Sequence, residues 1–256
     1  MARCQLCGIT SADISKAFSV CLVCIRRRPQ KALEMAVDAH RTSRAQFGLP
    51  PVPPDDPDGI LCNLCVNTCK IGKDCIGYCG LRKNQDGRLT GASTTKAKLS
   101  WYHDPLPTNC VANWVCGAGT GAGYPTCAHC LGAESGYKNL AVFKNLHVAL
   151  TSVENQRTID NFTRAAAHIS QRSQPPVLIA NTLLVTGYID AEEVAAIARF
   201  IASLDPNIPY SLQAFHPQFY MSDLPLTSRA LADRCCQAAR DAGLNDVRIG
   251  NVHLLT

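Results

Sequence analysis

The segment Cys62–Arg82 constrains the fold of this chain more than any other, because five cysteines fall within eighteen residues. The spacing is C-x2-C-x3-C-x5-C-x3-C, and the five are Cys62, Cys65, Cys69, Cys75 and Cys79. Thiolates held this close repel one another unless a cation shares their charge, and in a reducing compartment that cation is usually zinc or an iron–sulfur cluster. We therefore expect the five cysteines to share one zinc or iron–sulfur centre, with disulfides or inert thiols as the alternative.

A second set of cysteines lies near the start of the chain, as two C-x2-C pairs separated by thirteen residues. These four are Cys4, Cys7, Cys21 and Cys24. The spacing is typical of a four-cysteine zinc ribbon, in which the metal supplies folding energy that a very small core cannot. We expect structural zinc here, with a rubredoxin-like iron as the alternative. Apolar residues at helical spacing over 29–47 predict a helix that completes a first domain, residues 1–48.

The rest of the chain divides at a proline-rich segment. Residues 49–59 contain five prolines and should form a stiff, extended linker. A cysteine-rich metal-binding module is predicted over residues 60–135, and a last domain over residues 136–256. Four further cysteines in the module could bind another metal or be partly buried thiols; they are Cys110, Cys116, Cys127 and Cys130.

Strand and helix patterns alternate through the last domain. Buried strands are predicted at 140–143, 177–185, 210–215 and 246–249, and helices at 158–171, 191–204 and 226–242. Asp190 is in position to cap the helix at 191–204. Such alternation predicts βα units and a parallel sheet, hence an α/β fold. Asn181 and His216 fall toward the carboxyl ends of predicted strands, where such folds keep their sites.

Charge and hydropathy limit which partners and which cellular compartment we expect for this chain. The formal net charge is +5, and residues 60–100 carry seven Lys or Arg against two Asp or Glu. We interpret this basic excess, and Arg26–Arg28, as solvent-facing surface rather than as a site for nucleic acid or phosphate. The opening residues lack the apolar core of a secretory signal, and Val177–Val185 is too short to span a bilayer. We therefore expect a cytoplasmic protein with a protein or small-molecule partner and no membrane.

Several segments together resemble radical S-adenosylmethionine (radical SAM) proteins, in the branch related to AmmeMemoRadiSam-system and pyruvate formate-lyase-activating-enzyme proteins. The resemblance covers nearly the whole chain. The matching segments are Cys4–Cys24, Cys62–Arg82, Tyr102–Cys110, Gly136–Phe143, Pro175–Asp190, Phe200–Tyr220 and Val247–Leu255.

The resemblance implies a partial TIM-like barrel that carries a 4Fe–4S cluster. In the family, a C-x3-C-x2-C loop after the first barrel strand binds three irons. The fourth iron holds the amino and carboxylate groups of S-adenosylmethionine, which is cleaved reductively to a 5′-deoxyadenosyl radical. His216 matches a histidine that approaches this cofactor in relatives, and Asn181 is a further candidate for cofactor binding.

The sequence departs from the family where the cluster loop should begin. The match to the first strand ends at Phe143, and Lys144 begins sequence that resembles the region after the family's fourth strand. No C-x3-C-x2-C occurs anywhere among the fifteen cysteines. About three βα units, or roughly 90 residues, would be missing. The fold expected is therefore an incomplete barrel remnant behind a zinc ribbon and a cysteine-rich module.

These observations leave three hypotheses of function. The first is a radical SAM relative whose catalytic loop is lost, or whose reading frame is damaged or misassembled, and which does not cleave S-adenosylmethionine as written. Alternatively the chain is a non-enzymatic zinc or iron–sulfur module that contacts a protein or nucleic-acid partner. A third possibility is that the cysteines of Cys62–Arg82 carry a redox cluster that transfers electrons.

Overall fold

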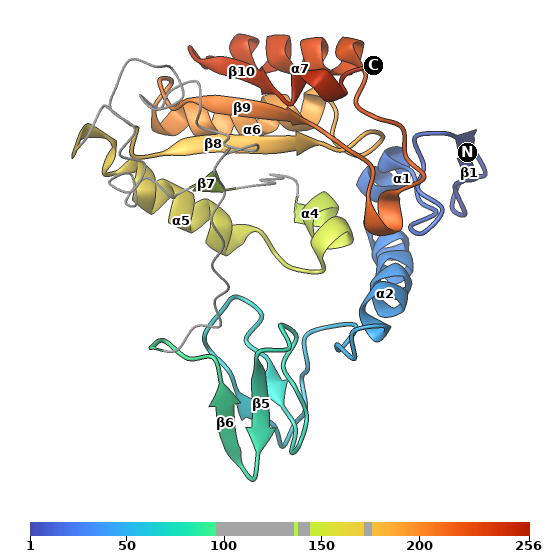
Figure 1. Ribbon diagram of the computed structural model, residues 1–256, viewed down its shortest axis with the longest axis vertical. Coiled ribbons are helices and arrows are strands. Elements are labelled where there is room, and N and C mark those ends of the chain that lie inside the picture. Colours follow the sequence, from blue (N-terminus) through green and yellow to red (C-terminus); the bar gives the residue numbers. More distant parts are fainter. Residues whose placement is uncertain (96–135, 138–143, 172–175) are drawn as a thin grey trace.

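A computed structural model describes residues 1–95, 136–137, 144–171 and 176–256 of the chain (Figure 1). The described helices are α1 (Leu22–Arg27), α2 (Pro29–Ala45), α4 (Lys144–Thr151), α5 (Gln156–Ala166), α6 (Ala191–Leu204) and α7 (Arg229–Asp241). Short 3-10 turns are η2 (Ile169–Gln171), η3 (Phe219–Met221) and η4 (Val252–Leu254). The strands are β1 (Ala2–Arg3), β2 (Thr10–Ser11), β3 (Ile60–Leu61), β4 (Lys70–Ile71), β5 (Arg82–Gln85), β6 (Arg88–Gly91), β7 (Gly136–Tyr137), β8 (Ile179–Leu184), β9 (Tyr210–Ala214) and β10 (Val247–Gly250).

The main sheet has four parallel strands in the order β10-β9-β8-β7, as expected for βα units. Three small antiparallel pairs, β1-β2, β3-β4 and β5-β6, belong to the two cysteine-bearing regions. In Figure 1, α6 and α7 lie along the main sheet. Helix α5 packs beside α6, with the Phe162 and Phe200 ring centroids 5.9 Å apart. The class is therefore mixed α/β, as the sequence predicts.

Alternation along the strands assigns one face of the sheet to the core. Ala180 and Leu184 of β8 and Leu212 of β9 join the buried cluster that contains the apolar residues of α6 and α7. The Tyr210 hydroxyl donates to Thr182 Oγ1 at 2.8 Å, which satisfies both polar groups within this layer. Burying these apolar side chains is the main stabilising term for the α/β layer.

Most predicted elements of the last domain are confirmed, with shifted ends. The helix α6 spans the predicted residues, and the Asp190 side chain accepts a hydrogen bond from the Glu193 N–H at 3.0 Å. The helix predicted at 158–171 is corrected, because α5 ends at Ala166 and a separate 3-10 turn follows. The strand predicted at 140–143 lies outside the described residues.

The first 28 residues, here called the N-terminal module, are docked on the edge of the sheet where β8 and β9 end. The Tyr188 hydroxyl accepts from the Ser15 N–H at 3.1 Å and donates to the Val20 carbonyl at 3.2 Å. Tyr188 is fully buried, and Phe18 packs on its ring. A side chain from the α/β layer is therefore built into the core of the N-terminal module.

An ion pair fixes a second point of this contact. Two guanidinium nitrogens of Arg26 each lie 2.8 Å from a different carboxylate oxygen of Asp190. Burial raises the pKa of Asp190, but hydrogen bonds from Arg26 and from the Glu193 backbone lower it further, so its pKa lies below the ordinary value. The interpretation of Arg26 as solvent-facing is thus wrong, because this arginine links α1 to the start of α6.

The backbone at Gly187 comes so close to the N-terminal module that only glycine fits. Gly187 has φ +82°, and a Cβ there would lie 1.9 Å from the Asp13 carbonyl oxygen. Gly87, at the tip of the β5-β6 hairpin, has a similar φ of +77° and nothing within 4 Å of its Cβ position. Both glycines have a backbone conformation that favours glycine. Only at Gly187 does another segment of backbone also lie against the Cβ position.

We predict that Gly187→Ala lowers the free energy of unfolding by about 3 kcal/mol or more, whereas Gly87→Ala costs about 1 kcal/mol. In both variants an alanine must adopt a left-handed backbone conformation. Only in Gly187→Ala must the added Cβ also push the N-terminal module away from the α/β layer. Denaturant unfolding of the full chain measures the difference. Equal losses in the two variants would mean that the N-terminal module is not docked at Gly187.

We also predict a pH-dependent deficit for Asp190→Asn. Asparagine keeps the helix cap, so the loss at neutral pH is the half-exposed ion pair alone, below about 1 kcal/mol, whereas Asp190→Ala loses about 1–2 kcal/mol. Because the folded pKa of Asp190 is lowered, its contribution is present above the unfolded pKa of about 4 and is lost as the pH falls through the folded pKa. Denaturant unfolding at several pH values measures this, with Asp86→Asn as an exposed control. A deficit that persists at the lowest pH would contradict the ion-pair explanation.

Candidate metal centre

The backbone of the N-terminal module brings its four cysteines to one point from two directions. Strands β1 and β2 pair antiparallel, and the turn between them carries Cys4 and Cys7. That turn closes with hydrogen bonds from the Cys4 N–H to Ile9 and from the Gly8 N–H to Cys4, both 2.8 Å. Cys21 stands at the N-cap of α1 and Cys24 lies within that helix. A turn and a helix start therefore face each other across the four sulfurs.

The four sulfur atoms have the spacing of a tetrahedral metal site. They all lie within 4.8 Å of one another, and the Cys4–Cys24 and Cys7–Cys21 sulfur pairs are each 3.8 Å apart. Four sulfurs at about 2.3 Å from a central zinc would be about 3.8 Å apart, the edge of that tetrahedron. A disulfide would need about 2.05 Å, and all four cysteines are free thiols. These residues can therefore hold one metal ion.

The negative charge of the cysteine thiolates explains why this group of sulfurs would bind a cation. Burial raises the pKa of Cys4, but hydrogen bonds from the backbone of Cys21, Cys7 and Leu6 outweigh it and lower this pKa to about 6. Burial raises the pKa of both Cys21 and Cys24, and neighbouring thiols raise that of Cys24 further. Burial and neighbouring thiols thus oppose the charged forms of Cys21 and Cys24, and a bound cation would favour them. Four thiolates suit zinc and also iron.

The cysteines of Cys62–Arg82 are arranged more loosely. In the described part of the chain, the four N-terminal cysteines form a group whose sulfur atoms all lie within 4.8 Å of one another. The five cysteines of Cys62–Arg82 do not form a second group of this kind among the described residues. Cys62 and Cys69 are buried, Cys65 is half-buried, and Cys75 and Cys79 are exposed. The structure thus places the five in one module but not at bonding distance.

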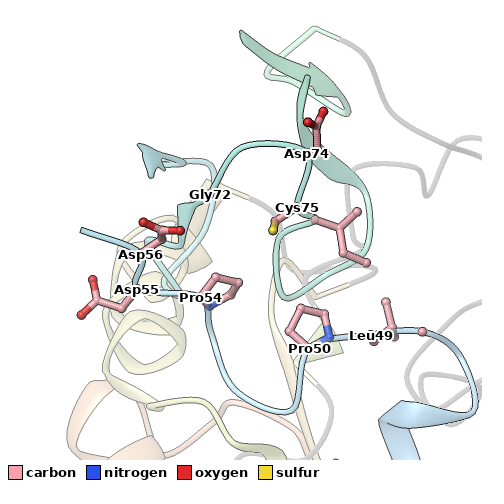
Figure 2. A pocket seen from close by; sticks show the side chains of 10 residues that line it. Leu49, Pro50, Pro54, Asp55, Asp56, Gly72, Asp74 and Cys75 are labelled. Carbon is pink, nitrogen blue, oxygen red and sulfur yellow. The ribbon is translucent and has the colours of Figure 1, made fainter. Parts of the chain in front are cut away.

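Cys75 lies on the wall of an open pocket of about 680 Å³, and neither Cys62 nor Cys69 is among the described residues that line it. Figure 2 shows Cys75 in this pocket, with Pro54 and Asp56 across from it. The pocket is also lined by Asp55 and Asp74. Three aspartates therefore line the same pocket as this thiol.

The two residues predicted to bind a cofactor occupy different environments. Asn181 lies on β8 with 3 % of its surface exposed, and its side-chain nitrogen has no hydrogen-bond partner among the described residues. His216 follows β9 and is exposed, at the edge of a pocket of about 490 Å³. Asn181 is not among the described residues that line this pocket. The structure therefore does not bring the two side chains into one described site.

His40 was missed by the sequence analysis although it lines the same pocket as His216. Its Nε2 lies 3.0 Å from the carbonyl oxygen of Ala149 in α4. Burial lowers the pKa of His40, partly opposed by that carbonyl and assisted by the charge of Arg44. A single histidine within a predicted helix carries no pattern that could have identified it, because the pocket forms only when α2 and α4 pack.

The other predicted metal ligands, Cys110, Cys116, Cys127 and Cys130, lie outside the described residues. Cys235 and Cys236 are buried on α7, where burial raises the pKa of each thiol. In the described parts of the chain, no helix has the length and apolar character needed to cross a membrane.

No family model, no curated protein and no solved structure matches this chain. The cysteine geometry and the fold therefore carry the functional interpretation.

We predict that Cys7→Ser reduces the metal content of the purified chain by about one equivalent and lowers its stability by several kcal/mol, because metal ligation supplies the folding energy of the N-terminal module. Elemental analysis and thermal unfolding measure the two effects. Cys236→Ala is the control, since this thiol packs on α7 away from the four-cysteine group. An unchanged metal content in Cys7→Ser would show that the four thiols hold no metal.

Proposed function

We propose that this chain is a zinc-binding relative of radical SAM proteins, in which a zinc ribbon is docked on a partial barrel, and that it does not cleave S-adenosylmethionine. The four thiols at tetrahedral spacing carry the proposal. The role of the zinc is to hold the N-terminal module in shape, so that Tyr188 and Asp190 can be bound by it.

The sheet supports the partial barrel. In a TIM barrel, each strand is followed by a helix and pairs in parallel with the next strand along the chain. Strands β7 to β10 are neighbours in sequence order, and α6 and α7 connect the last three of them. Such a barrel has eight strands, whereas the described part of the chain contributes four to this sheet, which fits a partial barrel.

The start of α4 supports the loss of catalysis. The family's cluster loop would follow Phe143, and there the chain enters the helix Lys144–Thr151, which contains no cysteine. No C-x3-C-x2-C occurs elsewhere in the sequence. Without a cluster, Asn181 and His216 have nothing to hold S-adenosylmethionine against, so their cofactor role belongs to intact relatives.

Two further parts of the proposal concern the second cysteine region and the compartment. The cysteines of Cys62–Arg82 form an accessory zinc or iron–sulfur centre, which the basic charge of that region would help to neutralise. The described cysteines are all free, and accessible free thiols persist in a reducing compartment. A cytoplasmic location fits this chemistry, as does a protein or small-molecule partner.

The test is anaerobic reconstitution of the full chain with iron and sulfide, followed by dithionite and S-adenosylmethionine. We expect no 5′-deoxyadenosine above a protein-free control, and no shift of the melting temperature on adding S-adenosylmethionine, in the wild type or in His216→Ala. We expect zinc in the chain as purified. Production of 5′-deoxyadenosine would overturn the proposed loss of catalysis, and a chain without zinc would overturn the proposed zinc ribbon.

A further inference from the structure

Cys62 and Cys69 face each other at the loop end of the short β3-β4 hairpin. Strands β3 and β4 pair antiparallel, and the next rung is a hydrogen bond of 2.8 Å from the Cys62 N–H to the Cys69 carbonyl. Facing residues on an antiparallel pair have neighbouring side chains. The loop between them holds Cys65, whose carbonyl accepts from the Thr68 N–H at 3.3 Å. Three cysteines therefore share one end of one hairpin.

Cys79 reaches the same place from another part of the module. A turn closed by a hydrogen bond of 2.9 Å from the Gly80 N–H to the Gly77 carbonyl carries Tyr78 and Cys79. Tyr78 is buried in a small cluster with Cys62, Cys69 and Ile71. Its neighbour in sequence is thereby positioned beside the hairpin thiols.

Outside contacts hold this turn in place. The Arg44 guanidinium lies 3.7 Å from the centre of the Tyr78 ring and donates to the Tyr78 carbonyl. Because Arg44 belongs to α2, the helix that leads from the N-terminal module also fixes the turn that carries Cys79.

The local backbone around Cys79 repeats a feature of the N-terminal site. There, the backbone of Leu6, two residues after Cys4, hydrogen-bonds the Cys4 sulfur. Here, the Leu81 N–H, two residues after Cys79, donates to the Cys79 sulfur at 3.4 Å. The two turns therefore present a cysteine sulfur to a backbone N–H in the same way.

Cys75 has different surroundings. It stands on the wall of the acidic pocket of Figure 2, and the other four cysteines are not among the described residues that line this pocket.

Packing shows why the module needs a ligand. Its buried apolar cluster, within the described residues, consists of Cys62, Cys69, Ile71 and Tyr78. Half of that cluster is thiol, and so few buried apolar side chains favour stabilisation of the described part of the module by a metal or a cross-link.

We infer that four of the five cysteines bind one zinc ion, Cys75 remaining a free thiol; the four are Cys62, Cys65, Cys69 and Cys79. The inference sharpens the accessory centre of the proposed function, and it is independent of the N-terminal zinc and of the loss of catalysis. The sulfurs are farther apart than those of the N-terminal site, so the ion draws them together and orders the module as it binds. Binding releases the remaining thiol protons to solvent.

The first experiment uses the wild-type chain and a thiol-alkylating reagent, with each cysteine followed by peptide mass spectrometry. With zinc present, Cys75 should be alkylated at the rate of an exposed thiol, while the other four are protected. A strong chelator should then expose all four together. Rapid alkylation of any of the four in the zinc-loaded chain would overturn the inference, as would protection of Cys75 that the chelator abolishes.

The second experiment compares Cys79→Ser with Cys75→Ser, two exposed cysteines of the same module. Cys79→Ser should lose about one equivalent of zinc, and Cys75→Ser should lose none. Acid-labile sulfide should be absent from both and from the wild type, because detecting it would point to an iron–sulfur cluster and overturn the zinc assignment. Protection of Cys4 and Cys7 from alkylation in both variants distinguishes a failure here from a failure of the proposed N-terminal zinc.

Discussion

Repulsion between closely held thiolates is the constraint on which the rest of this structure depends. In the N-terminal module, four sulfurs stand at about the edge length of a tetrahedron, and the pKa of Cys4 is lowered while those of Cys21 and Cys24 are raised. A bound divalent ion would turn that repulsion into four bonds. It would hold the turn at Cys4 against the start of α1 at Cys21, and with them the shape of the whole module.

The α/β layer contacts the N-terminal module through side chains that fit this shape. Tyr188 inserts its ring between segments of the N-terminal module, and Arg26, two residues after a candidate metal ligand, pairs with the carboxylate that caps α6. The metal site and the first helix after β8 are therefore mechanically linked. Loss of the ion should loosen the edge of the sheet as well as the small module itself.

Sequence reasoning predicted the periodic elements of the last domain and the grouping of the four N-terminal cysteines, for identifiable reasons. The cap at Asp190 and the helix α6 follow from local preferences, and the C-x2-C spacing reports a geometry that the backbone turn makes directly. It failed where tertiary contacts decide, because Arg26 was assigned to solvent although its partner is 164 residues away. Spacing alone also cannot show that Cys75 lines an acidic pocket, and one centre shared by all five cysteines of Cys62–Arg82 stays a prediction. His40 could not be found without the packing of α2 on α4.

The most direct test of this account is X-ray absorption at the zinc edge of the full chain as purified. The proposed thiolate sites predict a first coordination shell of four sulfur atoms at about 2.3 Å, with no nitrogen or oxygen ligands. A shell containing nitrogen or oxygen, or a chain without bound zinc, would contradict the claim that thiolates alone hold the metal on which the fold depends.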